Sequence, residues 1–262
     1  MALLLGFLLI LFGPLAANAQ LKTKLRPETL AAFNRYVSAA EETIRQRSHL
    51  QRSFLWAREQ NSRIEQLKKG EIVIEKGSIG RKSDVPDAMV HHWIAAVLVP
   101  NGSLERAVAL MQDFERHQKM YPEVISSRLI ERKGDILRGY WRLKKDKVIT
   151  AVLDTEQTAE YHQAGPSRNY SQSTFDIIRE VEDAGKPKER VLPPDEGHGF
   201  LWRLNAYWRL ETSPEGLYME SESISLSRDI PFGLSFIIKP LVEGLPRESL
   251  LGSLKATRAA LQ

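Results

Sequence analysis

The chain has 262 residues, with 37 basic and 33 acidic side chains, no cysteine and a hydrophobic content of 42%. This composition is typical of a globular protein. It excludes wholesale disorder, a disulfide framework, a thiol nucleophile and a cysteine-bound metal centre. The net charge of +4 is too small to argue for nucleic acid as a partner.

The first 19 residues, MALLLGFLLILFGPLAANA, carry no charge and predict a signal peptide. The apolar run over residues 3–15 is short for a membrane span, and Ala17-Asn18-Ala19 has the small-x-small form of a cleavage site. The basic residues that usually precede such a run are missing, which is consistent with a start further upstream. An uncleaved N-terminal anchor is the alternative to a signal peptide. We expect an exported protein, periplasmic or extracellular.

Residues 20–70 are predicted to form a basic helical arm. Pro27 and Glu28 suit a first helical turn, apolar residues then recur at helical spacing, and Gly70 ends a second helical stretch near 69. Residues 21–70 hold 11 basic and 5 acidic side chains, a net charge of 11 − 5 = +6, whereas the remainder has a net charge of −2. The arm is interpreted as a solvated helix face that covers the main domain, or as a peripheral membrane contact with anionic lipid head groups. The interspersed glutamates favour the first interpretation.

Residues 71–262 have the pattern of one α+β domain. Strands are predicted at 71–76, 88–99, 124–132, 135–144, 147–155, 168–182, 199–211 and 216–228. A helix over 103–120 is capped by Ser103. Two C-terminal helices are predicted at 231–243 and 246–261, with a break near Gly244-Leu245-Pro246. Consecutive strands with short turns form an antiparallel meander that must bury one face, and the C-terminal helix is the natural cover. A curved sheet closed over a helix leaves an interior for a small apolar ligand.

Four stretches resemble the START-like superfamily, also described as polyketide cyclase/dehydrase-like or SRPBCC. They are SLERAVALMQDFERHQKMYPEV at 103–124, HGFLWRLNAYWR at 198–209, SISLSRDIP at 223–231 and LPRESL at 245–250. The resemblance covers residues 85–262, and the last three stretches resemble uncharacterised bacterial members of the superfamily. It implies a helix-grip fold, in which a curved antiparallel sheet closes over a long C-terminal helix, and a hydrophobic ligand held between the two. A minority of members catalyse, so the fold alone does not assign an activity.

Strand alternation predicts which side chains face that interior. Even positions over 200–210 are apolar, whereas the odd positions are Leu201, Arg203, Asn205, Tyr207 and Arg209. We expect Tyr207 to be solvated. On the next strand, the odd positions over 221–227 are all serine, and the even positions over 218–228 include Glu220 and Glu222. A hairpin register in which paired numbers sum to 427 places Trp208 opposite Met219 and puts outward arginines beside outward glutamates.

The candidate ligand-binding residues are Trp93, Trp141, Phe175, Trp202, Leu204, Trp208, Met219, Arg228 and Phe236. Most are predicted on the inner faces, in the closing helix or at the rim, whereas both faces of the strand that carries Trp93 are apolar, so alternation does not assign its side. Plain core packing is the alternative for each aromatic residue. Arg228 is interpreted as a structural partner of Asp229 or as a rim group that meets a ligand carboxylate. His198 is interpreted as a backbone-bonded loop residue or as an acid/base at the cavity mouth.

No catalytic, metal or cofactor site is assigned. His91 and His92 are adjacent on a strand, so they face opposite sides and cannot ligate one ion together. The GxSxG, GxGxxG and GxxxxGK[ST] patterns are absent. The sequence therefore predicts an exported protein that binds a hydrophobic small molecule or lipid, does not bind nucleic acid, and has no assigned oligomeric state. The alternatives are a cyclase- or hydrolase-like enzyme that uses the same cavity, and an envelope interaction protein with a filled core.

Overall fold

The computed structural model describes residues 22–48, 53–79, 84–147, 150–229 and 235–262, so the leader lies outside the described residues. The elements follow in this order: β1 (Thr23–Lys24), α2 (Pro27–Ser48), a 3-10 turn (Trp56–Glu59), α3 (Asn61–Lys68), β2 (Val73–Lys76), β3 (Ala88–Val99), α4 (Leu104–Gln112), a 3-10 turn (Phe114–Arg116), α5 (His117–Met120), β4 (Val124–Lys133), β5 (Ile136–Asp146), β6 (Thr150–Gln163), β7 (Arg168–Glu182), β8 (Arg190–Val191), β9 (Glu196–Gly197), β10 (Arg203–Ser213), β11 (Gly216–Arg228) and α6 (Ser235–Leu261).

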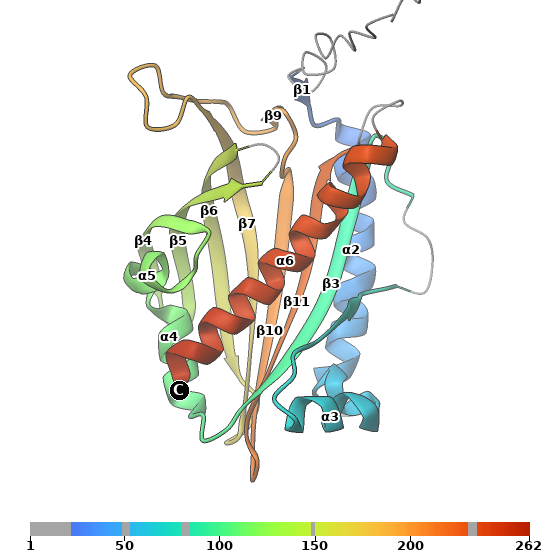
Figure 1. The fold of residues 1–262 in the computed structure, drawn as a ribbon, viewed down its shortest axis with the longest axis vertical. Coiled ribbons are helices and arrows are strands. Elements are labelled where there is room, and N and C mark those ends of the chain that lie inside the picture. Colours follow the sequence, from blue (N-terminus) through green and yellow to red (C-terminus); the bar gives the residue numbers. More distant parts are fainter. Residues whose placement is uncertain (1–21, 49–52, 80–83, 148–149, 230–234) are drawn as a thin grey trace, which may run out of the picture.

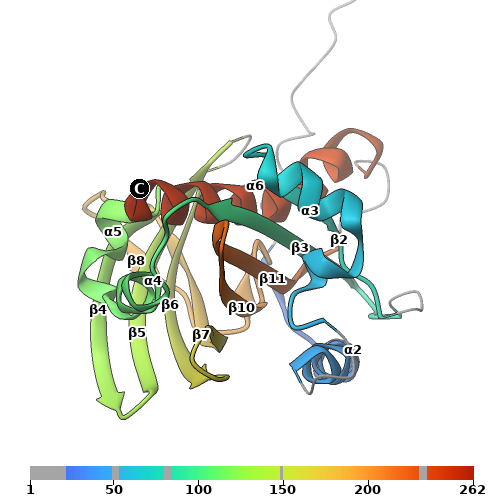
Figure 2. The same cartoon turned by 90° about the horizontal axis from the view of Figure 1, so that it is seen from below.

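One antiparallel sheet dominates the molecule. Its strands lie in the order β2-β3-β11-β10-β7-β6-β5-β4, and the short β8 pairs with β7 beside this path. Figure 1 shows α6 crossing the sheet diagonally. From below, the strands form a trough and α6 lies across its open side (Figure 2). This arrangement confirms the predicted helix-grip fold, because each layer buries its apolar face against the other.

Three predicted strands, 88–99, 168–182 and 216–228, match β3, β7 and β11 residue for residue. The predicted end of a strand at 155 is wrong, because β6 continues to Gln163. Its second half is rich in Glu, Gln and His, which favour strands weakly, so composition hides it. The predicted strand start at 199 is also wrong, since Gly199 has a φ of +76° and β10 begins only at Arg203.

The β10–β11 hairpin has a different register from the predicted one. Trp208 pairs with Ser221, and Ser213 pairs with Gly216, which leaves only two residues in the turn. A two-residue turn fixes the pairing of the strands that it joins. The predicted register is therefore wrong by two residues. A shift of two leaves every side chain on the same face, so the predicted alternation of faces survives.

The C-terminal helix is continuous. α6 runs through Gly244-Leu245-Pro246, so the predicted break there is wrong. Pro246 removes one backbone donor from the helix. The helix remains anchored beyond that point, because Leu250, Leu254 and Leu261 are buried in the core beneath it.

The helix predicted over 103–120 starts where expected. The Ser103 hydroxyl accepts the backbone N–H of Arg106 at 3.2 Å, which caps α4. The expected single helix is instead three pieces, because α4 ends at Gln112 and a 3-10 turn precedes α5. The break brings Phe114 and His117 into the interior, where they are 3% and 2% exposed.

The N-terminal segment packs against the outer face of the sheet. Figure 2 shows α2 outside the trough, away from α6. Its Phe33, Val37 and Ile44 share an apolar cluster with Tyr207 and Ile224 of the sheet. Tyr207 does point outward, but the expectation that it is solvated is wrong, because α2 covers it and leaves it 3% exposed. Its hydroxyl donates to Glu41 Oε1 at 2.8 Å.

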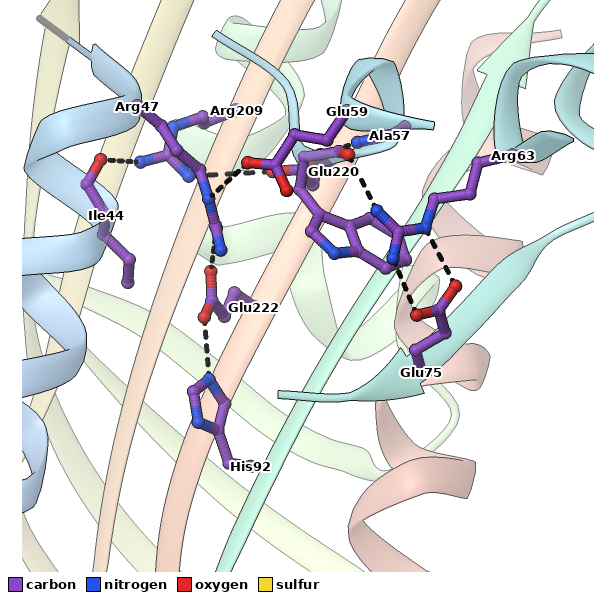
Figure 3. A network of polar contacts seen from close by, with 11 residues as sticks. Ile44, Arg47, Ala57, Glu59, Arg63, Glu75, His92, Arg209, Glu220 and Glu222 are labelled. Carbon is purple, nitrogen blue, oxygen red and sulfur yellow. Dashed lines mark hydrogen bonds and ion pairs between the residues drawn. The ribbon is translucent and has the colours of Figure 1, made fainter. Parts of the chain in front are cut away.

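A buried ionic network lies between α2 and this outer face (Figure 3). Arg47 Nη1 lies 2.8 Å from Glu222 Oε2, and His92 Nε2 donates to Glu222 Oε1 at 2.7 Å. Arg209 Nη1 lies 3.6 Å from Glu220 Oε1. Burial raises the pKa of Glu220 to about 7. Burial also acts to raise the pKa of Glu222, but the hydrogen bond from His92 and the charge of Arg47 outweigh it and hold that pKa below its usual value.

Basic residues of 20–70 pair with carboxylates elsewhere in the chain. These pairs are Lys22–Glu182, Lys24–Glu196, Arg47–Glu222, Arg58–Glu211, Arg63–Glu75 and Lys68–Glu215. The positive segment thus lies on acidic positions of the remainder, which has the opposite net charge. Whether residues 20–70 form a separate unit stays a prediction.

Candidate ligand-binding cavity

A cavity of about 830 Å³ lies between the inner face of the sheet and α6. Its size falls in the range of small-molecule sites, roughly 300–1,000 Å³. The walls are largely apolar and come from inward-facing positions on four strands and from α6: Leu143, Leu153, Ala159, Phe175, Leu204, Ala206, Trp208, Leu245 and Leu250.

One end of the cavity is closed by the segment after β3. Met111 and Phe114 line this end together with Tyr161 of β6, whose hydroxyl donates to the Met111 carbonyl at 2.8 Å. Phe114 rests on Gly139 of β5. A Cβ atom at position 139 would lie 1.9 Å from the Phe114 ring, so this approach requires glycine.

An aromatic wall is held in place by a buried histidine. The Trp141 Nε1–H donates to His117 Nδ1 at 3.1 Å, and His117 Nε2 donates to the Leu110 carbonyl at 3.3 Å. Burial lowers the pKa of His117 to about 4, so the ring is neutral at physiological pH, as an accepting Nδ1 requires. Phe175 packs on Trp141 with ring centroids 5.7 Å apart.

The opposite end of the cavity is lined by polar and charged residues. They come from the end of β5 and the residue after it (144–147), from the loop 198–200, from Arg228 at the end of β11 and Asp229 after it, and from Glu248 and Ser249 of α6. Lys145 pairs with Glu123, and its Nζ lies 3.3 Å from the Ser249 hydroxyl. The cavity therefore has a charged mouth and an apolar interior.

The loop at this mouth is fixed by Glu180 of β7, which is 5% exposed. Its Oε2 accepts the backbone N–H of His198 at 2.7 Å and the ring Nδ1–H at 2.8 Å. Its Oε1 accepts the N–H groups of Gly199 at 2.8 Å and Phe200 at 3.1 Å. Gly197, with a φ of +142°, leaves room for the carboxylate, since a Cβ there would lie 2.5 Å from Oε2. Four donors thus hold one buried carboxylate and orient the His198 ring.

The structure brings five of the nine candidate residues together. The cavity is lined by Trp141, Phe175, Leu204, Trp208 and Arg228. Met219 lies in the packed core with no exposed surface, and Trp93 is half-buried against the same core, with the Arg247 guanidinium 6.0 Å from its ring. The side chain of Phe236 lies outside the described residues.

Trp202 lies elsewhere, in the outer cluster with α2. It precedes the first residue of β10, so the alternation of that strand does not extend to it. His91 and His92 take opposite sides as predicted: His91 Nε2 lies 2.8 Å from the hydroxyl of the cavity-lining Ser227, whereas His92 reaches Glu222 in the outer network.

Sequence reasoning missed several lining residues, including Gln157, Ser171, His117, Tyr121 and Tyr161. Gln157 and Tyr161 lie in the part of β6 that was not predicted as strand. Strand alternation would place Ile177 on the face of Phe175, but Ile177 pairs beyond a bulge in the β6–β7 ladder, and Ile178 packs with Phe175 instead. A bulge reverses the alternation without leaving a pattern in the sequence.

Within the described part of the chain, no helix is long and apolar enough to cross a bilayer. Among the same residues, no group of three or more His, Asp or Glu side chains is placed to hold a metal ion. The features that define the site among the described residues are its apolar walls and its polar mouth.

No family model and no curated protein matches the chain. Solved structures match it in fold. A STAR-related lipid transfer protein from Xanthomonas axonopodis is 16% identical, with a TM-score of 0.47 over 72% of this chain and 98% of that one. The di-domain ARO/CYC StfQ from the steffimycin biosynthetic pathway is 13% identical, with a TM-score of 0.44 over 66% of this chain and 51% of that one. Human STARD10 is 12% identical, with a TM-score of 0.43 over 74% of this chain and 76% of that one. At these identities the likeness concerns the fold, and the function has to be argued from the cavity of this chain.

Proposed function

We propose that the protein is an exported START-like protein that binds a hydrophobic small molecule or lipid between its sheet and α6 without converting it. The observation that carries this proposal is the cavity of about 830 Å³ with largely apolar walls. Removing apolar ligand surface from water contributes about 25 cal/mol per Å² before the costs of ordering the ligand.

The mouth favours an amphiphile with its polar end outermost. Lys145, His198 and Arg228 line the cavity at this end, whereas Met111, Phe114 and Tyr161 close the other. A ligand that enters with its apolar end first keeps its polar group near water and charged side chains. Arg228 is the rim group that we expect beside a ligand carboxylate.

The proposal is tested by native mass spectrometry of the protein purified from its own host, followed by organic extraction. We expect a discrete co-purifying hydrophobic molecule, or, for an empty protein, displacement of a fluorescent apolar probe by long-chain amphiphiles. An empty protein that binds none of these probes would overturn the proposal.

A cavity-filling variant shows where a probe binds. Ser223 of β11 faces the cavity, so Ser223→Phe places a ring in open space and should weaken probe binding at least tenfold. Ser62→Phe introduces the same change on the exposed side of α3 and should leave binding unchanged. Thermal unfolding of both variants checks that the fold is retained. Equal binding by Ser223→Phe and wild type would place the probe outside the cavity.

A second candidate function is a cyclase- or hydrolase-like activity, favoured by the His198–Glu180 pair. Donation of Nδ1–H to Glu180 leaves Nε2 as the basic nitrogen of a ring that lines the cavity. If the protein converts its ligand, His198→Gln should abolish turnover with binding retained. If the extracted ligand returns unchanged from incubation with wild type, the enzyme candidate is wrong.

Export is part of the proposal and rests on residues 1–19. The intact mass of the protein from its host should correspond to a chain that begins at Gln20. A mass that includes the leader, with the protein recovered in the membrane fraction, would favour the anchor.

Membrane contact through residues 20–70 is tested separately with vesicles that contain anionic lipid. Because α2 covers an apolar cluster on the outer face of the sheet, deleting the segment would expose that cluster, so substitutions at exposed positions are used instead. Arg35→Gln combined with Lys69→Gln changes two exposed basic residues. Salt-sensitive sedimentation with vesicles that this double variant loses would support the contact, whereas no sedimentation of wild type would exclude it.

A further inference from the structure

The cavity wall contains a buried carboxamide that the fold does not satisfy. Gln157 of β6 is 3% exposed and lines the cavity. Its Nε2 is buried and has no hydrogen-bond partner among the described residues. Buried amides are paired in the great majority of cases, so this one needs a physical explanation.

The neighbours across the sheet explain why the chain supplies no partner. Gln157 pairs with Gly139 on β5 and with Phe175 on β7. Glycine has no side chain, and phenylalanine has no polar atom. Turning the amide to exchange its oxygen and nitrogen does not help, because these two neighbours offer neither a donor nor an acceptor in their side chains.

Serine hydroxyls line the cavity one inward-facing position closer to its closed end, level with Ala159 of β6. Ser173 of β7 and Ser223 of β11 both pair with Ala206 of β10, one on each side, and both line the cavity. Ala206 contributes only a methyl group, so the space above it is open between two hydroxyls. Ala159, two residues after Gln157, pairs with Ser173. Gln157 and Ser173 are therefore diagonal neighbours on adjacent strands, with their Cα atoms about 7–8 Å apart.

This group of polar side chains lies between the two ends of the cavity. On β6, Tyr161 marks the closed end, and Leu153 lies opposite Glu180 near the mouth. Gln157 is midway between them. These polar atoms therefore meet the body of a bound ligand and not its outermost end.

We propose that Gln157, with Ser173 and Ser223, hydrogen-bonds an oxygen-bearing group within the hydrophobic body of the ligand. The protein then selects a hydrophobic molecule that carries an internal carbonyl or hydroxyl over a plain hydrocarbon chain. This inference rests on the proposed function and names the substrate class. A site with buried polar groups discriminates against an analogue that leaves them unpaired.

The test compares octadecanoic acid with a series of oxo-octadecanoic acids in which the ketone occupies different positions along the chain. Each acid displaces a fluorescent apolar probe from wild type, Gln157→Leu and Gln163→Leu. Gln163 lies on the same strand and is exposed, so the last variant is a matched control. We expect at least one oxo isomer to bind wild type and the control about tenfold more tightly than octadecanoic acid.

In Gln157→Leu, the preference should fall below twofold, and octadecanoic acid should bind at least as well as to wild type. Leucine has a similar volume and removes the unpaired amide, so thermal unfolding without ligand should occur at no lower temperature. Ser173→Ala and Ser223→Ala should each reduce the preference by a smaller factor, and they provide the same readout if the leucine variant does not fold.

The outcomes separate this inference from the proposed function. If octadecanoic acid binds but no isomer is preferred, or if the preference survives Gln157→Leu, an ordered water satisfies the amide and this inference is wrong while the binding function stands. If neither octadecanoic acid nor any isomer displaces the probe, and nothing co-purifies with the protein, the proposed function itself fails.

Discussion

Consecutive residues of β11 lie in two very different environments. Glu222 points to the outer face, where it contacts Arg47 and His92 and is 3% exposed. Ser223 points to the inner face and lines an open cavity. One face of the strand is thus covered by a buried network of acidic and basic side chains, and the other borders open space. The contrast indicates that the N-terminal segment fixes the central strands from outside, so that the inside need not be filled.

The outer face is stable because each buried charge lies close to an opposite charge. A buried charge without a partner costs several kcal/mol, and here carboxylates and cations lie in contact. The inner face follows the opposite principle, since a void sacrifices packing contacts that a ligand can later supply. These two principles predict different effects for substitutions at neighbouring positions.

The largest effect is expected at Glu222. Glu222→Leu leaves Arg47 with a more distant carboxylate, Glu59 at 3.4 Å, and removes the acceptor from His92. The free energy of unfolding should fall by about 3–5 kcal/mol, measured by urea denaturation. The adjacent Ser223→Ala should change it by less than about 0.5 kcal/mol. A loss below about 1 kcal/mol for Glu222→Leu would contradict this account of the outer face.

Replacing both residues of the Glu222–Arg47 ion pair tests whether the unpaired Arg47 causes the loss of stability. In Glu222→Leu combined with Arg47→Met, no unpaired cation remains, so the double variant should recover a large part of the lost stability. If the two losses simply add, the ion pair is not the source of the effect.

The pH dependence of stability is expected to follow Glu220. Burial raises the pKa of its carboxyl group from 4.5 to about 7, so between these values the folded chain holds a proton that the unfolded chain has released. The free energy of unfolding therefore falls by about 3 kcal/mol as the pH rises through this window, because each pKa unit corresponds to about 1.36 kcal/mol. Above the window the contribution of Glu220 is constant. Glu222 acts in the opposite direction: its lowered pKa stabilises the fold above the unfolded pKa, and this contribution is lost as the pH falls.

Glu220→Gln isolates this contribution. Urea denaturation at pH 5 and pH 8 should show a decline in wild type that exceeds the decline in the variant by about 3 kcal/mol. Glu65→Gln, on an exposed position of α3, should behave as wild type. Equal declines in wild type and Glu220→Gln would mean that the buried carboxyl group does not titrate in this window.

The same two faces show what the sequence can predict. The alternation of apolar and polar residues in β10 correctly separated Ala206 and Trp208 from Tyr207, because side chains alternate along any strand. It did not reveal that α2 covers Tyr207, since alternation says which face a residue takes and nothing about what packs on that face.

The candidate site was accessible to prediction only in part. Trp208 and Leu204 follow from strand alternation, whereas Gln157 lies in a polar stretch beyond the predicted strand end at 155. Trp202 was assigned to the inner face from a strand predicted to start at 199. That assignment is wrong because Gly199 turns the chain before β10 begins. Bulges, tight turns and strand ends depend on contacts between distant segments, and a local pattern does not contain them.

The smallest expected difference in unfolding free energy is the one between alanine variants of two leucines on the inner face of β10. Leu210 is 1% exposed in the packed core, whereas Leu204 is half-buried and lines the cavity. Leu210→Ala should cost about 3 kcal/mol of unfolding free energy, because it opens a new void among contacting side chains. Leu204→Ala removes atoms that already border open space, so it should cost about 1 kcal/mol and enlarge the cavity without unfolding it. Urea denaturation of both variants measures the difference of about 2 kcal/mol. Equal losses would mean that the wall at Leu204 is packed as tightly as the core, which would remove the distinction between a structural end of β10 and a ligand-binding end.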